Sequence, residues 1–358
     1  MKKITYRERR AIAIENDLMR VVATMEGGHI AEILHKATNV NPLWTPPWRS
    51  IEPSTYTREK HPEYGTENEA LLLAGIMGHN VCLDTFGGPS PEEAGAGIPV
   101  HGEGPVAQYE VEGGDDWIEM EAVLEKAQLR FARRISIAPD SMTVGFFEEL
   151  ENLSAVDRPI AWTQHVTIGP PFLERGKTRF GISATRSRVI DSSFNDGKGL
   201  QASGEEFMWP HCPMKDGSVS DLRAFTEAAI SGGFTSHLMD TEKESAHFMA
   251  WSPSSRILFG YVWSRADFPW LARWEENHLR TQPPWNGKGL ACGMEFGVSP
   301  VAESRRQMVE RGSLFGVPGY RWIPAHTSLK VSYSAFLEVA DSMPDSNLQE
   351  ELAAVHSK

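Results

Sequence analysis

Most apolar residues of the chain fall into short segments in which apolar and polar positions alternate. Alternation with a period of two is typical of a strand that buries one of its faces. Turn-forming clusters such as Gly27-Gly28 and Gly87-Gly88-Pro89 separate these segments. The pattern predicts strands over residues 18–24, 143–150, 160–168, 179–190, 256–263 and 329–339.

Helical periodicity is confined to a few short segments, at residues 67–73, 301–311 and 346–356. Strands that recur without long helices between them argue against a parallel sheet and for an antiparallel sandwich. The fold class that we predict is all-β, a large antiparallel β-sandwich with few short helices. Because no repeat or low-complexity linker divides the chain, we expect one domain over residues 1–345 and an acidic C-terminal tail over residues 346–358.

The net charge of this chain indicates which classes of partner it can bind. Its 358 residues contain 35 Lys plus Arg against 48 Asp plus Glu, a net charge of −13 with histidine neutral. An acidic chain without a basic block repels phosphate backbones and anionic lipid headgroups, so we expect no nucleic-acid or membrane partner. We expect a small molecule as the partner, bound by a monomer or a homodimer.

Several features that are missing from the sequence also carry information. Neither a secretion signal nor an apolar run long enough to cross a bilayer is visible, which favours a cytoplasmic protein. Cys82, Cys212 and Cys292 lack C-x-x-C spacing, so we interpret them as reduced thiols. The sequence lacks G-x-G-x-x-G, G-x-x-x-x-G-K-[ST], H-E-x-x-H and G-x-S-x-G, and we expect neither a cofactor nor a metal.

Two histidines stand in surroundings that suit a polar cleft. His101 precedes a glycine and is held near a turn, where its imidazole faces either a cleft or the backbone of the turn. In the segment 161–171, alternation places His165 on one face together with Thr163 and Thr167, opposite most of the apolar side chains. This polar face looks either at solvent or at a cleft.

One carboxylate stands in an apolar segment punctuated by glycines. Glu295 lies between Met294 and Phe296 within residues 291–300. Burial there would raise its pKa toward the range of a general base, whereas on an edge strand the side chain would point to water.

A segment rich in tryptophan precedes this carboxylate. Within residues 268–278, Trp270 and Trp274 offer apolar faces for a sugar ring, and Arg273 and Asn277 offer partners for its hydroxyl groups. The alternative is that these tryptophans pack in the core.

Four short motifs occur in a fixed order along the chain: Gly27-Gly28-His29-Ile30, His101-Gly102, Gln164-His165 and Met294-Glu295-Phe296. In combination they resemble the galactose mutarotase-like superfamily, the aldose 1-epimerases and their relatives. The resemblance extends over residues 16–339, which is nearly the whole chain.

The resemblance implies a β-sandwich that interconverts the anomers of a free aldose by acid–base opening of the sugar ring. It implies a general base at Glu295, a general acid at His165 and a His101 that binds or polarises the substrate. The other candidate substrate-binding residues are Arg273, Trp274, Trp270 and His237.

Two departures from the family pattern leave other functions open. Family members show an Asn-Arg pair and a Gly-aromatic-Asp-His segment, whereas this chain has Gly78-His79-Asn80 without an adjacent Arg and Gly233-Phe234-Thr235-Ser236-His237 without the Asp. A non-catalytic carbohydrate-binding protein on the same fold and a sugar-phosphate epimerase are therefore alternatives. A glycoside hydrolase would need a second carboxylate such as Glu103 or Asp240, and a zinc site would use His101, His165 and His237.

Overall fold

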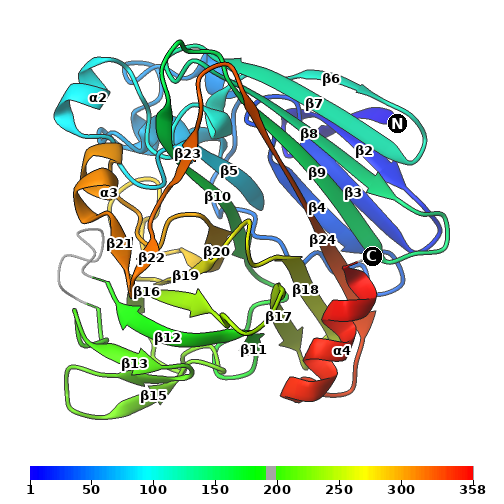
Figure 1. Ribbon diagram of the computed structural model, residues 1–358. Helices are drawn as coiled ribbons and strands as arrows, with labels where there is room; N and C mark the ends of the chain where they lie inside the picture. The colour runs from blue at the N-terminus through cyan, green and yellow to red at the C-terminus, as the bar shows by residue number, and fades with distance from the viewer. Residues whose placement is uncertain (191–198, 358) are drawn as a thin grey trace.

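The computed structural model describes residues 1–190 and 199–357, and two large antiparallel sheets make up most of it (Figure 1). This architecture confirms the predicted all-β sandwich. The larger sheet has 12 strands. In spatial order they are β1 (Lys2–Tyr6), β2 (Arg9–Glu15), β3 (Met19–Thr24), β4 (Ile30–His35), β5 (His79–Asp84), β10 (Arg158–Ile168), β20 (Leu290–Gly297), β19 (Trp270–Asn277), β16 (Ser231–Met239), β12 (Ala184–Val189) and β13 (Glu206–Met208), with β23 (Arg321–Ile323) also paired to β10.

The second sheet has 8 strands and covers one face of the first. Its strands in spatial order are β11 (Arg179–Ile182), β17 (Ser245–Ser252), β18 (Ile257–Ser264), β24 (Ser328–Val339), β9 (Thr143–Asn152), β8 (Leu129–Ile137), β7 (Trp117–Leu124) and β6 (Glu110–Gly113). Two further hairpins join β14 (His211–Pro213) to β15 (Val219–Asp221) and β21 (Ser313–Leu314) to β22 (Val317–Pro318).

The helices of the described residues are short. They are α1 (Ala70–Gly75), α2 (Pro91–Gly95), α3 (Arg305–Arg311) and α4 (Ser346–His356), with 3₁₀ turns η1 (Pro53–Thr55), η2 (Pro62–Tyr64) and η3 (Gly104–Val106). In the part of the chain that the structure describes, none of them is both long enough and apolar enough to cross a membrane. Helix α3 begins later than the segment 301–311 predicts, because Ser304 caps it and accepts a hydrogen bond from the Gln307 amide.

Helix α4 confirms the helix predicted over residues 346–356 and shows how the end of the chain is held. It packs against β17, β18 and β24 of the second sheet (Figure 1). Ala353 is buried there, and the ring of His356 stacks on Phe336 with centroids 4.1 Å apart. The described part of the expected acidic tail is therefore docked on the sandwich, and residue 358 lies outside the described residues.

The prediction of one strand over residues 179–190 is wrong. The structure has two strands there, because the chain leaves β11 in the second sheet and enters β12 in the first at Ser183. The Ser183 amide donates a hydrogen bond to the carbonyl of His247 (3.1 Å), which holds the crossing in place. Alternation of side chains does not reveal which sheet a strand joins. The alternating pattern therefore predicted one strand where the chain passes from one sheet to the other.

The main core lies between the two sheets and contains residues of both. On β10, the side chains of Trp162, Val166 and Ile168 point into this core. Successive side chains of a strand point to opposite faces, and so Thr163 and His165 lie on the outer face of the larger sheet. This is the division of faces that the sequence predicts for this strand.

A buried ion pair lies on the core-facing side of the second sheet. Arg133 of β8 and Glu148 of β9 are almost fully buried, with Nε and Oε1 2.7 Å apart. Gln164 of β10 meets both from the other sheet, since its amide donates to Glu148 (2.7 Å) and its Oε1 accepts from Arg133 (2.9 Å). The hydroxyl of Tyr333 also donates to Glu148 (2.6 Å), and His79 hydrogen-bonds to Gln164 (3.0 Å). Such partners are what an ion pair needs to persist in a core.

Two histidines of the larger sheet region are buried in their neutral form. Burial lowers the pKa of both His29 and His237 to about 3. The His29 Nε2 donates a hydrogen bond to the carbonyl of Pro105 (2.9 Å). His237 lies between the hydroxyl groups of Ser187 and Thr235, each 2.8 Å from one ring nitrogen.

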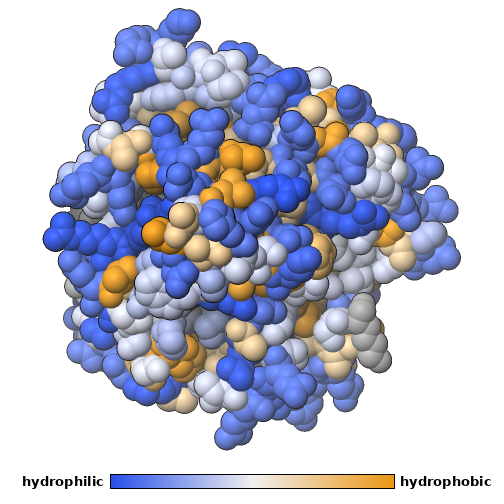
Figure 2. All heavy atoms as spheres, turned by 45° about the horizontal axis from the view of Figure 1, so that its top comes forward, coloured by the Kyte–Doolittle hydropathy of each residue, from blue (hydrophilic) through white to orange (hydrophobic). Residues whose placement is uncertain are grey.

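Hydrophilic residues predominate on the face drawn in Figure 2. Figure 2 shows small groups of apolar residues among hydrophilic ones on the face that comes forward when the top of Figure 1 is tilted toward the viewer. Trp322 of β23 is one exposed aromatic residue, and its ring meets Tyr320 edge to face at 5.9 Å. Small apolar groups of this kind are ordinary on protein surfaces and need no partner.

Removal of one half of the Arg133–Glu148 pair leaves the other charge buried without its counter-ion. We expect Arg133→Met to lower the free energy of unfolding by about 3–5 kcal/mol, measured by denaturant titration. The control is Arg134→Met, because Arg134 has a side chain that is 45% exposed and pairs with Glu119 at the surface (3.2 Å). Its loss costs about 1 kcal/mol or less. Equal losses in the two variants would contradict a special role for the buried pair.

The buried histidines make the fold sensitive to mild acid. The unfolded chain takes up protons on histidine near pH 6.5, whereas folded His29 and His237 stay neutral down to about pH 3. The folded state therefore binds fewer protons, and each ring lowers stability by about 1.4 kcal/mol per pH unit as the pH falls through this window. We expect a lower calorimetric melting temperature at pH 5 than at pH 7, and a smaller difference in His237→Gln. Coincident midpoints at the two pH values would show that the rings titrate normally in the fold.

Candidate active site

Neighbouring strands of the larger sheet bring the predicted acid and base together on its outer face. His165 of β10 is directly opposite Glu295 of β20 on one side and Asn80 of β5 on the other. The His165 Nε2 lies 3.1 Å from Glu295 Oε1, and its Nδ1 lies 3.2 Å from the hydroxyl of Thr167. Directly opposed residues of antiparallel strands share a face, so strand register alone brings the two side chains into contact.

His101 reaches the same place from the loop after β5. It has a positive φ of 64°, and Gly102 follows with a φ of 74°. A Cβ atom on Gly102 would lie 1.6 Å from the carbonyl oxygen of Leu83, so only glycine fits where this loop meets β5. The ring of His101 stands edge to face against that of His165, with centroids 5.0 Å apart, and its Nδ1 lies 2.8 Å from the sulfur of Cys82.

These three side chains line a pocket of about 340 Å³, a size that suits a small molecule. Trp44, Trp274 and Trp285 form an aromatic wall in it. The rings of Trp44 and Trp285 stack at 5.9 Å, and Trp274 meets Trp285 edge to face at 6.0 Å. An aromatic wall beside a polar pair suits a ligand with apolar faces and hydroxyl groups on its edge.

Arg280 supplies a cation to the pocket lining. Its guanidinium lies 4.6 Å from the ring centroid of Trp285 and 5.5 Å from that of Trp274. It also forms ion pairs with Glu69 and Glu276, both at 3.4 Å. Two carboxylates therefore offset one guanidinium, and the described lining has no excess of positive charge.

Burial controls the protons of the Glu295–His165 pair. Both side chains are buried in the sheet face. Burial raises the pKa of the Glu295 carboxyl well above its ordinary value and lowers the pKa of His165 to about 4. Between these two values the pair holds one proton, which burial favours on the carboxyl because both groups are then neutral.

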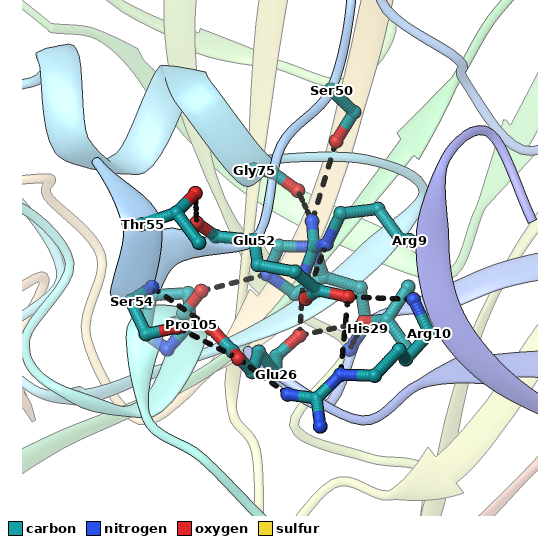
Figure 3. Close-up of polar contacts among 11 residues, drawn as sticks. Arg9, Arg10, Glu26, His29, Ser50, Glu52, Ser54, Thr55, Gly75 and Pro105 are labelled. Atoms are coloured by element: carbon teal, nitrogen blue, oxygen red, sulfur yellow. Dashed lines mark hydrogen bonds and ion pairs between the residues drawn. The ribbon is translucent and has the colours of Figure 1, made fainter. Parts of the chain in front are cut away.

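Buried Arg9 of β2 contacts the end of α1, the helix whose Leu72 and Leu73 line the pocket. Figure 3 shows its hydrogen bonds. Arg9 donates hydrogen bonds to the carbonyl of Gly75 at the end of α1 (2.7 Å) and to that of Glu26 (2.6 Å). Beside it, His29 reaches Pro105 in the loop that carries the pocket histidine. Arg9 and His29 thus contact the end of α1 and the loop that carries His101.

Some of the predicted site residues meet in this pocket: its lining includes Glu295, His165, His101 and Trp274. The others do not reach it. Arg273 points to the opposite face of β19 and pairs there with Glu275 at 3.2 Å. Trp270 shares the face of Trp274 but is covered by the β21–β22 hairpin, where its Nε1 donates to the carbonyl of Pro318 (3.0 Å).

His237 also lies away from the pocket, between the two hydroxyl groups described above. The structure therefore does not assemble His101, His165 and His237 into the zinc site considered from the sequence. Within residues 1–190 and 199–357, no group of three His, Cys, Asp or Glu side chains is placed to hold a metal ion.

Sequence reasoning missed Trp44 and Trp285 as parts of the pocket wall, and Cys82 as a contact of His101. A signal was present for the tryptophans, because Trp44 and Trp48 flank Pro46-Pro47 and Trp285 follows Pro283-Pro284. Tryptophan beside paired prolines indicates a stiff loop with a large aromatic side chain, which is a common way to build a pocket wall.

Solved structures with the same fold have very different sequences. A candidate aldose 1-epimerase from Klebsiella pneumoniae aligns with a TM-score of 0.71 and 14% identity, over 100% of this chain and 87% of that one. A galactose mutarotase-like protein from Clostridium acetobutylicum aligns with a TM-score of 0.60 and 14% identity, over 94% and 98% of the two chains. For a galactose mutarotase related enzyme from Lactobacillus acidophilus the TM-score is 0.60 and the identity 11%, over 93% and 99%.

No protein-family model and no curated protein matches the sequence. At such low sequence identity, the structural alignments show a shared fold but not a shared activity. The activity has to be inferred from the residues of the site. The chain has the galactose mutarotase-like fold.

Proposed function

We propose that this protein is an aldose 1-epimerase, which interconverts the α and β anomers of a free sugar by opening and closing its ring. The proposal is carried by the Glu295–His165 pair, 3.1 Å apart in a pocket with a tryptophan wall. The fold shared with candidate aldose 1-epimerases and mutarotase-like proteins supports the same reaction.

Each proton in this reaction has a donor and an acceptor in the site. The carboxylate of Glu295 takes the proton of the anomeric hydroxyl while protonated His165 gives one to the ring oxygen, so that the C1–O5 bond breaks and an open-chain aldehyde forms. After rotation about the C1–C2 bond, the oxygen attacks the other face of the carbonyl. Both proton transfers then reverse, and the enzyme returns to its starting state.

The shifted pKa values of the pair suit this exchange. The reaction starts with the single proton on His165, whereas burial by itself favours the proton on Glu295. The two states differ only by transfer along the 3.1 Å contact, so their ratio does not depend on pH while the pair holds one proton. Hydroxyl groups of a bound sugar supply the hydrogen bonds that stabilise the charged state.

The charges of the pocket favour an uncharged sugar over a sugar phosphate. A phosphate needs uncommitted cationic donors, usually from Arg or Lys. Arg280 is already paired with Glu69 and Glu276, and Glu67 adds a further carboxylate to the lining. These carboxylates repel a phosphate and tolerate neutral hydroxyl groups.

Replacement of either member of the pair tests the reaction directly. Glu295→Gln keeps size and burial but removes the base, and His165→Asn removes the acid. We expect each to lower the enzymatic rate of mutarotation, followed by polarimetry of freshly dissolved aldoses, by about 10²–10⁴-fold. The matched control is His237→Asn, which replaces a histidine that is equally buried outside the pocket and keeps the rate per folded molecule.

A wild-type rate in Glu295→Gln would contradict the proposed reaction. A wild-type protein that binds free sugars in calorimetry without accelerating mutarotation would instead identify a carbohydrate-binding protein, the alternative on the same fold. A pH–rate profile without a decline toward acid would contradict the role of His165, because a second proton enters the pair near pH 4.

Substitution of each of the two tryptophans of β19 distinguishes a side chain that binds the sugar from one that packs in the fold. Trp274→Leu removes part of the pocket wall, and we expect KM for a reactive aldose to rise by about tenfold, since an aromatic face contributes about 1–1.5 kcal/mol. Trp270→Leu lowers the melting temperature and leaves KM of the folded enzyme unchanged, because Trp270 lies under the hairpin. Equal effects of the two variants on KM would remove Trp274 from the proposed binding surface.

A further inference from the structure

The reaction proposed above makes no use of the contact between Cys82 and His101. The sulfur of Cys82 lies 2.8 Å from the Nδ1 of His101. Cys82 is fully buried on β5, where it is directly opposite Thr163 of the strand that carries His165. The contact therefore joins the loop of His101 to the rigid sheet beneath the pocket.

Both partners of this contact are neutral at pH 7. Burial, with a smaller contribution from Glu295, raises the pKa of the Cys82 thiol well above its ordinary value. Burial lowers the pKa of His101 well below its ordinary value, and the electrostatic interaction with His165 makes a smaller contribution in the same direction. The contact is thus one between a thiol with its proton and an imidazole with a single N–H.

The burial of Cys82 decides which ring nitrogen of His101 carries that proton. Cys82 is fully buried, and its sulfur is within hydrogen-bond distance of the Nδ1 of His101. A buried thiol that keeps its proton needs an acceptor, and an Nδ1 without hydrogen is the acceptor within reach. The Cys82 thiol then donates to Nδ1, and the N–H of the ring is on Nε2.

We propose that Cys82 is a positioning residue whose thiol holds His101 in the Nε2–H tautomer, so that the ring offers a hydrogen-bond donor to a sugar oxygen beside Glu295 and His165. The hydrogen bond made by one ring nitrogen of a histidine sets the proton on the other. When a sugar binds, one of its oxygens accepts a hydrogen bond from this Nε2–H. The part of the proposal that concerns the sugar rests on the proposed function, whereas the tautomer does not.

The tautomer can be measured without any assay of activity. In ¹⁵N spectra of protein labelled in histidine, the protonated and unprotonated nitrogens of a neutral ring have well-separated shifts. Comparison with His101→Gln identifies the signals of His101 among the 12 histidines. We expect a protonated Nε2 and an unprotonated Nδ1 at pH 7, and a protonated Nδ1 in the wild-type protein would overturn the proposal.

Substitution of Cys82 tests the consequence for the reaction. Cys82→Ala removes the donor, and we expect a mixture of tautomers and a kcat lower by about tenfold, a part of the ~10²–10⁴-fold that acid–base groups supply, with a smaller change in KM. Cys82→Ser keeps a donor and restores both the Nε2–H tautomer and most of kcat. Cys212→Ala is the control, since Cys212 is also fully buried but packs with Val189 and Leu222 instead of His101.

The outcomes separate this proposal from the proposed function. A Cys82→Ala variant that keeps both the Nε2–H tautomer and the wild-type kcat would show that the thiol does not position the ring. If Cys82→Ala does not fold, the wild-type spectrum and the Cys82→Ser variant decide the question. If the tautomer is as expected but no free aldose is epimerised faster than in buffer, the proposed function fails and the contact between Cys82 and His101 stands.

Discussion

The buried pair of Arg133 and Glu148 is the constraint on which the sandwich depends. A charge in an apolar core is strongly unfavourable unless its partner and the remaining hydrogen bonds are in place. Gln164 supplies hydrogen bonds to both charges from the opposite sheet, and so the two sheets fit together only where it can reach them. His165 follows Gln164 on the same strand and points the other way. The core network that aligns the sheets therefore also determines where the candidate acid stands on the outer face.

The parts of the molecule that could be predicted from sequence are those that depend on local pattern. Alternation on one strand separated His165 from Trp162 and placed the histidine on a polar face. The four short motifs, in their order along the chain, were enough to identify the fold and to suggest Glu295 as the partner of His165. The strand register that places Glu295 opposite His165 could be found only from the structure.

The parts that could not be predicted depend on how distant segments pack. Alternation states which face a residue occupies but not which part of that face a pocket covers, and so Trp270 was grouped with Trp274 although a hairpin covers it. The same alternation places Arg273 on the other face from Trp274, so the two side chains cannot line one pocket. Trp44 and Trp285 lie on loops far apart in the chain, and nothing local indicates that they stack.

The crossing at Ser183 has a mechanical consequence for the sandwich. It links an edge strand of one sheet, β11, to a strand near the edge of the other, β12, through a single residue. Consecutive Cα atoms are about 3.8 Å apart, so the two sheets are joined at this corner by nearly the shortest connection that a chain allows. The two sheets therefore cannot move apart at this corner unless β11 or β12 is lost.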